Sequence, residues 1–422
     1  MAEQIQIKDR DTNPDLHRVL WLSDSALGTT GFGNQTKNIC KRLQNYSNWD
    51  MWHIAWNQHG QPLAPPIKLL DTSEEFNFPI LTGGKQQYAI DLWDHYFTKY
   101  KPDIFGVLLD TFMLFPIYIQ KQFPCKTFFY FPSDGGWFPK GCEQILKKCN
   151  LPIAMSKFGR DQLADTYGIQ CEYIPHGCDA HKNFFPQDKQ QAKIQFGIDP
   201  NIFVVGANFR NQGRKFTGKM VKAFAEFSKD KNDVVLLQNT DPTDPAAAND
   251  IMYLAQRFKC PHKIRFTGMT WTQGLSMEQL SVLYNAFDVN LSTTSGEGFG
   301  ITTIEAMASE VPTVIPEYTT GKELVADHKA GIATKLIGQE KEGDSFPHER
   351  VNVEGVIEGS WEVDRGIVSI KDTVRALQYM YDNPAERARM GRNGRAAVLR
   401  EYDWESGGII KKWNKVLGAL VR

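Results

Sequence analysis

The chain has 422 residues, which at about 150 residues per domain predicts two or three domains rather than one core. With 41% hydrophobic and 23% charged residues, 34 Gly and 21 Pro, the composition excludes collagen-like, coiled-coil and disordered proteins. Lys and Arg (48) nearly balance Asp and Glu (49), so no net field favours nucleic acid or an anionic membrane. A polyanionic ligand must therefore meet a local cationic patch.

Cysteine usage and hydropathy indicate the compartment. The seven cysteines are scattered, without CxxC pairs, which is typical of a reducing compartment and predicts no structural zinc. The chain has no run of about 18 apolar residues, and its polar start, MAEQIQIKDR, lacks a signal-peptide core. We expect a soluble, cytoplasmic protein, with peripheral membrane contact left open.

Short apolar runs alternate with amphipathic stretches in the first part of the chain, as in βα units around a parallel sheet. The glycine-rich turn GTTGFG follows the first run and opens a helical stretch, and Ser156 is placed to cap a later helix. The expected strands are Arg18–Asp24, Met51–Trp56, Asp103–Leu109, Lys126–Phe131 and Leu151–Ala154, with a helix at Asn34–Leu43.

A second series of the same kind follows Ile174–Pro186, a segment rich in Gly, Pro and polar residues that suits an inter-lobe connection. Residues 330–364 are Gly- and Glu-rich and predict a loop insertion, and residues 371–422 return to a helical pattern. The expected strands are Ile202–Gly206, Asp233–Gln238, Lys263–Phe266, Val289–Ser292 and Val311–Ile315, and the helices are Lys215–Phe227, Asp250–Phe258, a helix opened by the capping box at Ser276, and Thr302–Ala308.

These two series predict an α/β protein with two Rossmann-like lobes facing across a cleft. We place the first domain at residues 1–180 and the second at 181–395, with residues 396–422 forming a helix that packs back on the first domain. In open parallel sheets ligands bind beyond the carboxyl ends of the strands. Function is therefore to be sought in the loops that follow strands.

The most informative loop is the sequence SGEGFGITTIEAMA, which begins at Ser295 and runs from a strand end through a glycine-rich turn into a helix. Such a helix start presents free backbone N–H groups and binds anions. Glu297 and Glu305 are eight residues apart, roughly 12 Å along a helix, which is too far for a glycosidase pair. Two carboxylates beside an anion site suit the two polyols of a nucleotide sugar. The alternative is a capping Glu297 and a solvated Glu305.

A second loop, ANFRNQGRKFTGK, follows the first strand of the second series. It places Arg210, Arg214 and Lys215 at the carboxyl end of that strand, where guanidinium and ammonium groups could neutralise a departing diphosphate. Three basic residues on a solvated helix start are the alternative.

Together these loops resemble the GT-B glycosyltransferases of family 4 (glycosyl transferases group 1), whose second lobe carries a Glu-x₇-Glu motif. The chain reads EGFGITTIE at Glu297, followed by EAMASEVPTVIP, and its IPHGCD at Ile174 and MSKFGRDQL at Met155 are similar to further motifs of the family. The resemblance extends from about residue 18 to residue 330, and it includes the glycine loop near the start.

The resemblance implies a role for each matching residue. Arg210 and Lys215 would hold the donor diphosphate, Glu305 the ribose hydroxyls and Glu297 the transferred sugar. Catalytic roles are implied for Glu297, Lys215, Arg210 and Asp134; Asp134 stands in YFPSDGGW where many members have a histidine. The other residues implied in donor binding are Gly31, Gly33, Gly268, Met269, Gly298, Phe299, Gly300 and Ile301.

The implied activity is that of a retaining, metal-independent hexosyltransferase with a UDP- or GDP-sugar donor and no further cofactor. The acceptor is a glycan, a lipid-linked molecule or a small molecule, and nucleic acid is not favoured. The single D-x-D, at Asp9–Asp11, lies in the polar N-terminal tail and gives no support for a metal site. His176 is expected to be structural. The alternative is a nucleotide-sugar-binding protein with other chemistry, such as an epimerase, or without catalysis.

Overall fold

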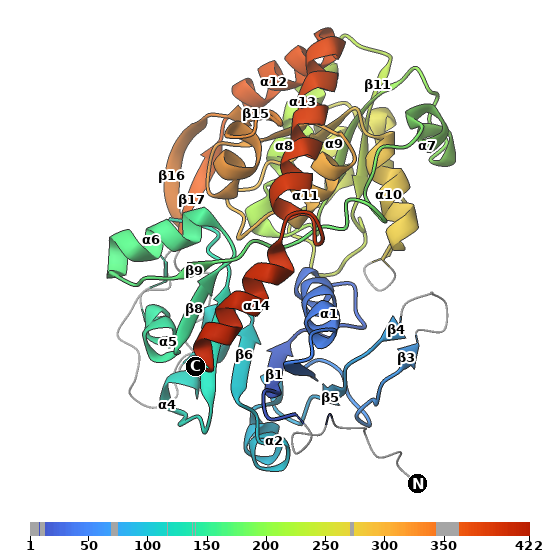
Figure 1. Cartoon of the computed structure of the whole chain (residues 1–422). Coiled ribbons are helices and arrows are strands. Elements are labelled where there is room, and N and C mark those ends of the chain that lie inside the picture. The colour runs from blue at the N-terminus through green and yellow to red at the C-terminus, as the bar shows by residue number, and fades with distance from the viewer. Residues whose placement is uncertain are drawn as a thin grey trace.

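The computed structural model describes residues 8, 13–68, 75–115, 117–136, 138–139, 141–270, 274–342 and 363–422. The chain forms two lobes, each built on a parallel sheet with helices packed against it (Figure 1). The expected α/β architecture is thereby confirmed. Asp9 and Asp11 lie outside the described residues.

The first lobe contains a seven-stranded parallel sheet in the order β5-β2-β1-β6-β7-β8-β9. All five strands expected from its sequence are present, whereas β5 and β9 at the two edges span only three and two residues and give no usable hydrophobic pattern. A two-stranded antiparallel hairpin, β3 with β4, lies apart from this sheet. The strands are β1 His17–Ser23, β2 Trp49–Ala55, β3 Ile67–Lys68, β4 Glu75–Phe76, β5 Ile80–Thr82, β6 Ile104–Leu108, β7 Lys126–Phe131, β8 Leu151–Ala154 and β9 Glu172–Tyr173.

The second lobe contains a six-stranded parallel sheet in the order β12-β11-β10-β13-β14-β15. Its strands are β10 Phe203–Asn208, β11 Val234–Asn239, β12 Ile264–Phe266, β13 Val289–Leu291, β14 Thr313–Pro316 and β15 Gly331–Thr334. An antiparallel pair, β16 (Leu336–Glu342) and β17 (Val363–Val368), follows it.

The expectation of a loop insertion at residues 330–364 is wrong for the part that the structure describes. β15 is an edge strand of the second sheet, and β16 and β17 pair with each other across residues 343–362, which lie outside the described residues. The pattern gave no strand signal because β15 has only four residues and begins with Gly331, and because β16 ends in charged residues.

The helices begin close to the expected positions. Ser156 caps α6, where its Oγ accepts a hydrogen bond from the N–H of Gly159 at 3.0 Å, and Ser276 and Gln279 form the expected capping box of α10. The helices are α1 Gly31–Gln44, α2 Trp93–Tyr100, α3 Thr111–Leu114, α4 Ile117–Gln120, α5 Glu143–Lys148, α6 Lys157–Tyr167, α7 Lys189–Gln195, α8 Thr217–Ser228, α9 Ile251–Arg257, α10 Met277–Ala286, α11 Ile301–Ala308, α12 Ile370–Asp382, α13 Pro384–Ala397 and α14 Ile409–Leu420.

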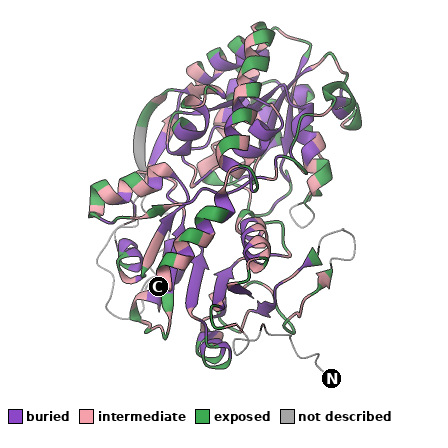
Figure 2. Ribbon diagram, in the orientation of Figure 1, coloured by how far each residue is buried: buried purple, intermediate pink, exposed green. Residues whose placement is uncertain are grey.

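Both sheets are covered on their two faces, so their central strands are buried along almost their whole length (Figure 2). This is why they read as continuous apolar runs rather than as alternating patterns. The last helix, α14, lies on the first lobe (Figure 1), where the fully buried Trp413 contacts the rings of Trp21, Phe128 and Tyr130. The chain therefore crosses between the lobes twice.

The two crossings run side by side and are hydrogen-bonded to each other. The N–H of Cys178 donates to the carbonyl of Tyr402 at 2.8 Å, and the N–H of Trp404 donates back to the carbonyl of Cys178 at 3.1 Å. The buried Asp403 carboxylate accepts from the N–H of Ala180 at 3.0 Å. These bonds fix the lobes next to each other on one side of the molecule.

Candidate functional site

The strand order of each sheet reverses once, and these two positions face the same cavity. In the first sheet β2 and β6 lie on opposite sides of β1, and in the second sheet β11 and β13 lie on opposite sides of β10. Loops that follow strands at such a switch point form the binding crevice of open α/β sheets. A cavity of about 700 Å³ lies here between the lobes, lined by residues 31–32, 110–113, 132–135, 138–139, 155, 176, 212–215, 297–302, 363 and 365.

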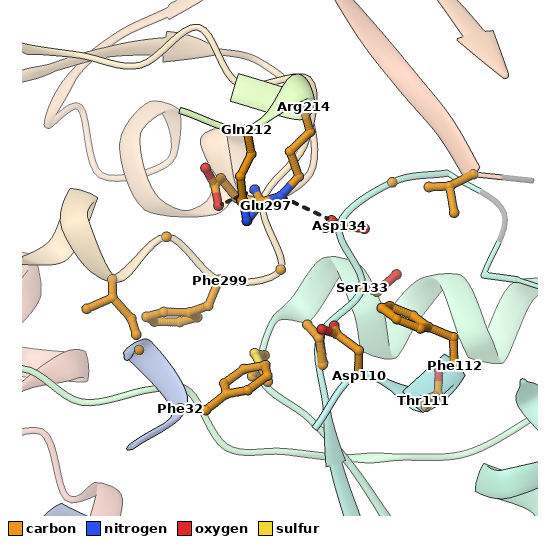
Figure 3. A pocket seen from close by; sticks show the side chains of 18 of the residues that line it. Phe32, Asp110, Thr111, Phe112, Ser133, Asp134, Gln212, Arg214, Glu297 and Phe299 are labelled. Atoms are coloured by element: carbon orange, nitrogen blue, oxygen red, sulfur yellow. Dashed lines mark hydrogen bonds and ion pairs between the residues drawn. The ribbon is translucent and has the colours of Figure 1, made fainter. Parts of the chain in front are cut away.

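The second-lobe wall of this cavity carries an ion-paired cluster. Glu297 accepts a hydrogen bond from the guanidinium of Arg214 at 3.1 Å (Figure 3). Its other carboxylate oxygen contacts the ammonium of Lys215. Both cations belong to a short 3₁₀ turn, Gly213–Lys215, that follows β10. Because all three charged groups are largely removed from water, their mutual attraction is stronger than it would be at the surface.

This cluster determines the charge of Glu297. Burial alone would raise the pKa of its carboxyl group, but the nearby Lys215 and Arg214 outweigh burial and lower that pKa to about 2. Glu297 is therefore ionised throughout the neutral range. An incoming diphosphate would have to compete with it for the same two cations.

Hydrogen bonds between two loops hold the cluster in place. The carbonyl of Arg214 accepts from the N–H of Ser295 at 2.7 Å and from its hydroxyl at 2.9 Å, and the hydroxyl of Thr293 donates to the carbonyl of Lys215 at 3.0 Å. The loop after β13 is thus hydrogen-bonded to the turn that carries Arg214 and Lys215.

The glycines of this loop allow the first lobe to come close. A Cβ at Gly296 would lie 1.7 Å from the carbonyl oxygen of Asp134, and one at Gly298 would lie 2.4 Å from the Cβ of Pro132. Any side chain at these positions would push the lobes apart. The glycine-rich motif therefore serves the contact between the lobes as well as the turn into α11.

The first-lobe wall carries carboxyl and aromatic groups. Asp134 lies 3.8 Å from the guanidinium of Arg214 (Figure 3). It also lies 3.0 Å from the guanidinium of Arg365, so two cations of the second lobe offset its charge. Asp110, two residues after the end of β6, has its pKa raised to about 7 by burial and by the charge of Asp134. The rings of Phe32, Phe112 and Phe138 also line this side. Carboxyl groups and aromatic rings are well suited to a polyhydroxyl ligand.

His176 is fully buried at the junction of the lobes and also lines the cavity. Its Nδ1 lies 2.7 Å from the hydroxyl of Tyr130, and its ring is 5.2 Å from that of Phe299. Burial lowers its pKa to about 3, so the imidazole is neutral at physiological pH. These contacts support the structural role expected from the sequence.

The structure brings most of the expected site residues to the cavity, but not all of them. Arg210 instead pairs with Asp244 at 3.1 Å, and its side chain is 58% exposed. The residues that line the cavity are Gly31, Asp134, Lys215, Glu297, Gly298, Phe299, Gly300 and Ile301, whereas Gly33, Arg210, Gly268, Met269 and Glu305 do not line it. Arg214, four residues after Arg210, takes the position beside Lys215.

Glu305 lies within α11 and is buried, with 8% of its surface exposed. Its carboxyl group accepts a hydrogen bond from the hydroxyl of Tyr284 at 2.7 Å. Burial raises its pKa to about 7, and the Tyr284 hydrogen bond offsets this only in part. Solvation of Glu305, the alternative to a binding role, is therefore wrong.

Asp110 and Arg365 were not singled out from the sequence. Asp110 had a usable signal, since it directly follows the expected strand Asp103–Leu109 and such loops carry function. Arg365 had none, because it reaches the cavity only through the pairing of β17 with distant segments.

Comparison with solved structures identifies the fold. Sucrose-phosphate synthase from Thermosynechococcus elongatus superimposes with a TM-score of 0.72 at 16% identity, covering 96% of this chain and 99% of that one. Anabaena Alr3699/HepE, solved in complex with UDP and glucose, gives a TM-score of 0.68 at 15% identity, covering 96% and 100%. Two Rossmann-like lobes around one cleft, together with these neighbours, define the GT-B fold.

Sequence comparison points to the same family as the motifs. Residues 199–343 match the family model of the glycosyl transferases group 1, in agreement with the resemblance seen in the sequence. Mannosylfructose-phosphate synthase of Agrobacterium fabrum is 28% identical over 180 residues (40% of this chain, 38% of that protein). D-inositol 3-phosphate glycosyltransferase of Segniliparus rotundus is 26% identical over 285 residues (66% and 55%). The chain thus spans less than two thirds of either relative.

The described residues were also searched for membrane-spanning helices and for metal-binding clusters. None of the described helices has the combination of length and apolar character needed to cross a membrane. Among the same residues, no cluster of three or more His, Cys, Asp or Glu side chains is arranged to hold a metal ion, and the seven cysteines are all free thiols.

Proposed function

We propose that the protein is a retaining, metal-independent hexosyltransferase that moves a hexose from a UDP- or GDP-sugar to an acceptor hydroxyl. One observation carries the proposal: Arg214 and Lys215 lie together with the start of α11 on one wall of an interlobe cavity, and carboxyl and aromatic groups lie on the other. The group 1 match over residues 199–343 covers the cationic wall and supports the same assignment.

The diphosphate of the donor binds at Lys215 and Arg214 and draws both cations away from Glu297. The freed Glu297 then accepts hydrogen bonds from the sugar, beside the backbone at Gly298, Phe299, Gly300 and Ile301. Two side-chain cations supply the charge that a metal ion provides in other transferases. Gly31 approaches the diphosphate from the first lobe.

Glu305 accepts hydrogen bonds from the ribose once the donor is bound, and the base lies toward Gly268 and Met269. Gly33 assists at the diphosphate, and the role of Arg210 in donor binding stays a prediction that requires its side chain to leave Asp244. Each of these residues lies outside the lining of the cavity.

In the reaction the bond between the anomeric carbon and the diphosphate oxygen breaks while the acceptor oxygen bonds to that carbon from the same face. The acceptor proton passes to the leaving diphosphate. Glu297 and Asp134 are both held by cations, which disfavours either one as a covalent nucleophile. Catalysis then consists of orienting the two substrates and stabilising the leaving group.

The acceptor binds against the first-lobe wall. Asp110, whose pKa of about 7 leaves it partly protonated at neutral pH, can both donate and accept a hydrogen bond with an acceptor hydroxyl. The aromatic rings of Phe112 and Phe138 supply an apolar face for a sugar ring. Glycans, lipid-linked molecules and small polyols are all compatible with this wall as acceptors. The protein would act in the cytoplasm on a soluble acceptor and at a membrane surface on a lipid-linked one.

The test is incubation with UDP-glucose or GDP-mannose and a panel of sugar, sugar-phosphate and glycolipid acceptors. We expect release of the nucleoside diphosphate that depends on one acceptor class, with an α-linked product visible by NMR, in the presence of EDTA. If the protein binds the nucleotide sugar but releases no nucleoside diphosphate with any acceptor, the enzymatic proposal is contradicted. An inverted anomer, or loss of activity in EDTA, would contradict the retaining or metal-independent part.

A further inference from the structure

The strand β17 touches both loops that carry charged groups into the cavity. On one side, the N–H of Gly136 in the first lobe donates to the carbonyl of Asp364 at 3.0 Å, and the N–H of Asp364 donates back to the carbonyl of Gly136 at 2.7 Å. On the other side, the N–H of Gly366 donates to the carbonyl of Ser295 at 2.9 Å. β17 therefore joins the Asp134 loop to the Glu297 loop at the boundary between the lobes (Figure 1).

Arg365, between these backbone contacts, is directed at Asp134. Its Nη1 donates to the main-chain carbonyl of Asp134 at 2.7 Å and lies 3.0 Å from the carboxylate. The Arg365 side chain is 10% exposed, and the residue lines the same cavity as Asp134. One guanidinium nitrogen thus fixes both the backbone and the side chain of a single residue.

The other cation near Asp134 is differently placed. Arg214 lies 3.8 Å from the Asp134 carboxylate, while its closer contacts are to Glu297 at 3.1 Å and to the carbonyl of Gly296 at 3.2 Å. Arg214 is also adjacent to Lys215, where an anionic ligand would bind. Arg365 reaches Asp134 from β17, whereas Arg214 reaches it from the turn after β10, so the two cations hold Asp134 from different segments of the second lobe.

We propose that Arg365 is a positioning residue, which holds the Asp134 loop in its catalytic arrangement from across the cleft while Arg214 turns to the donor diphosphate. This inference rests on the proposed function and assigns a role to the β16–β17 pair that follows the second sheet. Asp134 then keeps a cationic partner throughout the reaction, and its loop stays attached to the lobe that binds the donor.

The test compares Arg365→Ala and Arg365→Lys with Arg375→Ala, which removes an exposed arginine of α12 in the same lobe and serves as the matched control. We expect Arg365→Ala to lower kcat about tenfold with donor KM within about twofold, because a misplaced loop impairs catalysis without removing a donor contact. Arg365→Lys should recover part of the loss, and Arg375→Ala should match the wild type. Adding Asp134→Asn to Arg365→Ala should cost less than the two separate losses combined.

A second measurement is independent of activity. Hydrogen–deuterium exchange of the peptide that spans residues 132–136 should be faster in Arg365→Ala and unchanged in Arg375→Ala. Wild-type kcat and wild-type exchange in Arg365→Ala would overturn the proposal, as would a rise in donor KM with kcat unchanged. If the wild-type protein transfers no sugar, the proposed function fails, while the exchange measurement still tests whether Arg365 holds the loop.

Discussion

The two ends of the Glu-x₇-Glu motif lie in opposite electrostatic environments. Glu297, on the turn before α11, contacts two cations, which lower its pKa to about 2. Glu305, inside the helix, is buried with one tyrosine hydroxyl as its hydrogen-bond partner, and burial raises its pKa to about 7. The same side chain eight residues apart is fully ionised in one case and close to half protonated at neutral pH in the other. The surroundings, rather than the motif, therefore set the charge that each glutamate presents.

The difference also separates two ways of preparing a binding site. Glu297 holds Lys215 and Arg214 together on one wall of the cavity, and in the proposed function a diphosphate replaces it there, so that end of the motif would be preorganised for the donor. Glu305 is buried and close to half protonated at neutral pH, and in the proposed function it would accept a hydrogen bond from the ribose in surroundings where such a bond is strong. Variants that alter one environment at a time can test this contrast.

The largest effect is expected for Lys215→Ala. Loss of the ammonium leaves the departing diphosphate with Arg214 alone, and we expect kcat to fall by roughly 10²- to 10³-fold, as for removal of one preorganised charge at an active site. Steady-state rates of nucleoside diphosphate release measure it. Lys222→Ala, on an exposed position of α8, is the control. Wild-type kcat in Lys215→Ala would remove the cation pair from the mechanism.

Glu305→Gln should stabilise the protein at high pH. A buried carboxyl whose pKa is raised above its unfolded value of about 4.5 binds its proton more tightly in the folded state, so it lowers stability increasingly as the pH rises from about 4.5 to about 7. The neutral amide avoids this cost. At roughly 1.4 kcal/mol per pKa unit, a rise from about 4.5 to about 7 corresponds to a gain on the order of 3 kcal/mol at pH 8 and almost none at pH 4.

Urea unfolding of Glu305→Gln and of the wild type at both pH values measures the gain, with the exposed Glu317→Gln as control. Glu323 and Asp110, whose pKa values are also raised to about 7 mainly by burial, contribute the same pH trend to both proteins and cancel in the difference. Equal differences at pH 4 and pH 8 would contradict the raised pKa of Glu305.

Much of the fold was predictable because its central strands are continuous buried runs. β1, β2, β6, β7 and β8 each gave such a run, as did the strands from β10 to β14. The edge strands β5 and β9 are too short to show a pattern, and the β16–β17 pair is defined by contacts between segments far apart in the sequence. Pairing of that kind has no local signal.

The placement of Lys215 and Glu297 at the cavity was predictable, because both lie in loops that follow strands of the second sheet. The choice between Arg210 and Arg214 was not, because it depends on how the chain turns after β10: Asn211, held by Asn249 and Thr217, anchors the turn that brings Arg214 to the cavity. Insertion or deletion of one residue in that turn would alter which side chain faces Glu297. Sequence spacing alone does not specify it.

Glu297→Gln should separate binding of the product from turnover. The amide holds Lys215 and Arg214 less tightly than the carboxylate does, so free nucleoside diphosphate should bind about tenfold more tightly, a change of about 1.4 kcal/mol. Transfer should become slower, because the neutral group orients the sugar less well. Calorimetric titration with UDP and GDP checks the affinity, and Glu226→Gln on an exposed position of α8 is the control. Weaker diphosphate binding would show that Glu297 does not compete for the cations.

The smallest effect is expected for Tyr284→Phe, at the other end of the motif. The hydroxyl of Tyr284 donates to Glu305 at 2.7 Å and accepts from the amide of Asn208 at 2.8 Å, so its removal leaves the buried Glu305 and the half-buried Asn208 with one partner fewer each. We expect a loss of about 1 kcal/mol in the free energy of unfolding, since the ring still fills its place in the core.

The Tyr284 hydrogen bond lowers the pKa of Glu305, so that pKa should rise further in the variant. The loss should then be larger at pH 8 than at pH 4 in urea unfolding, and adding Glu305→Gln should remove this pH dependence. A pH-independent loss would mean that Glu305 is not the group that responds to Tyr284.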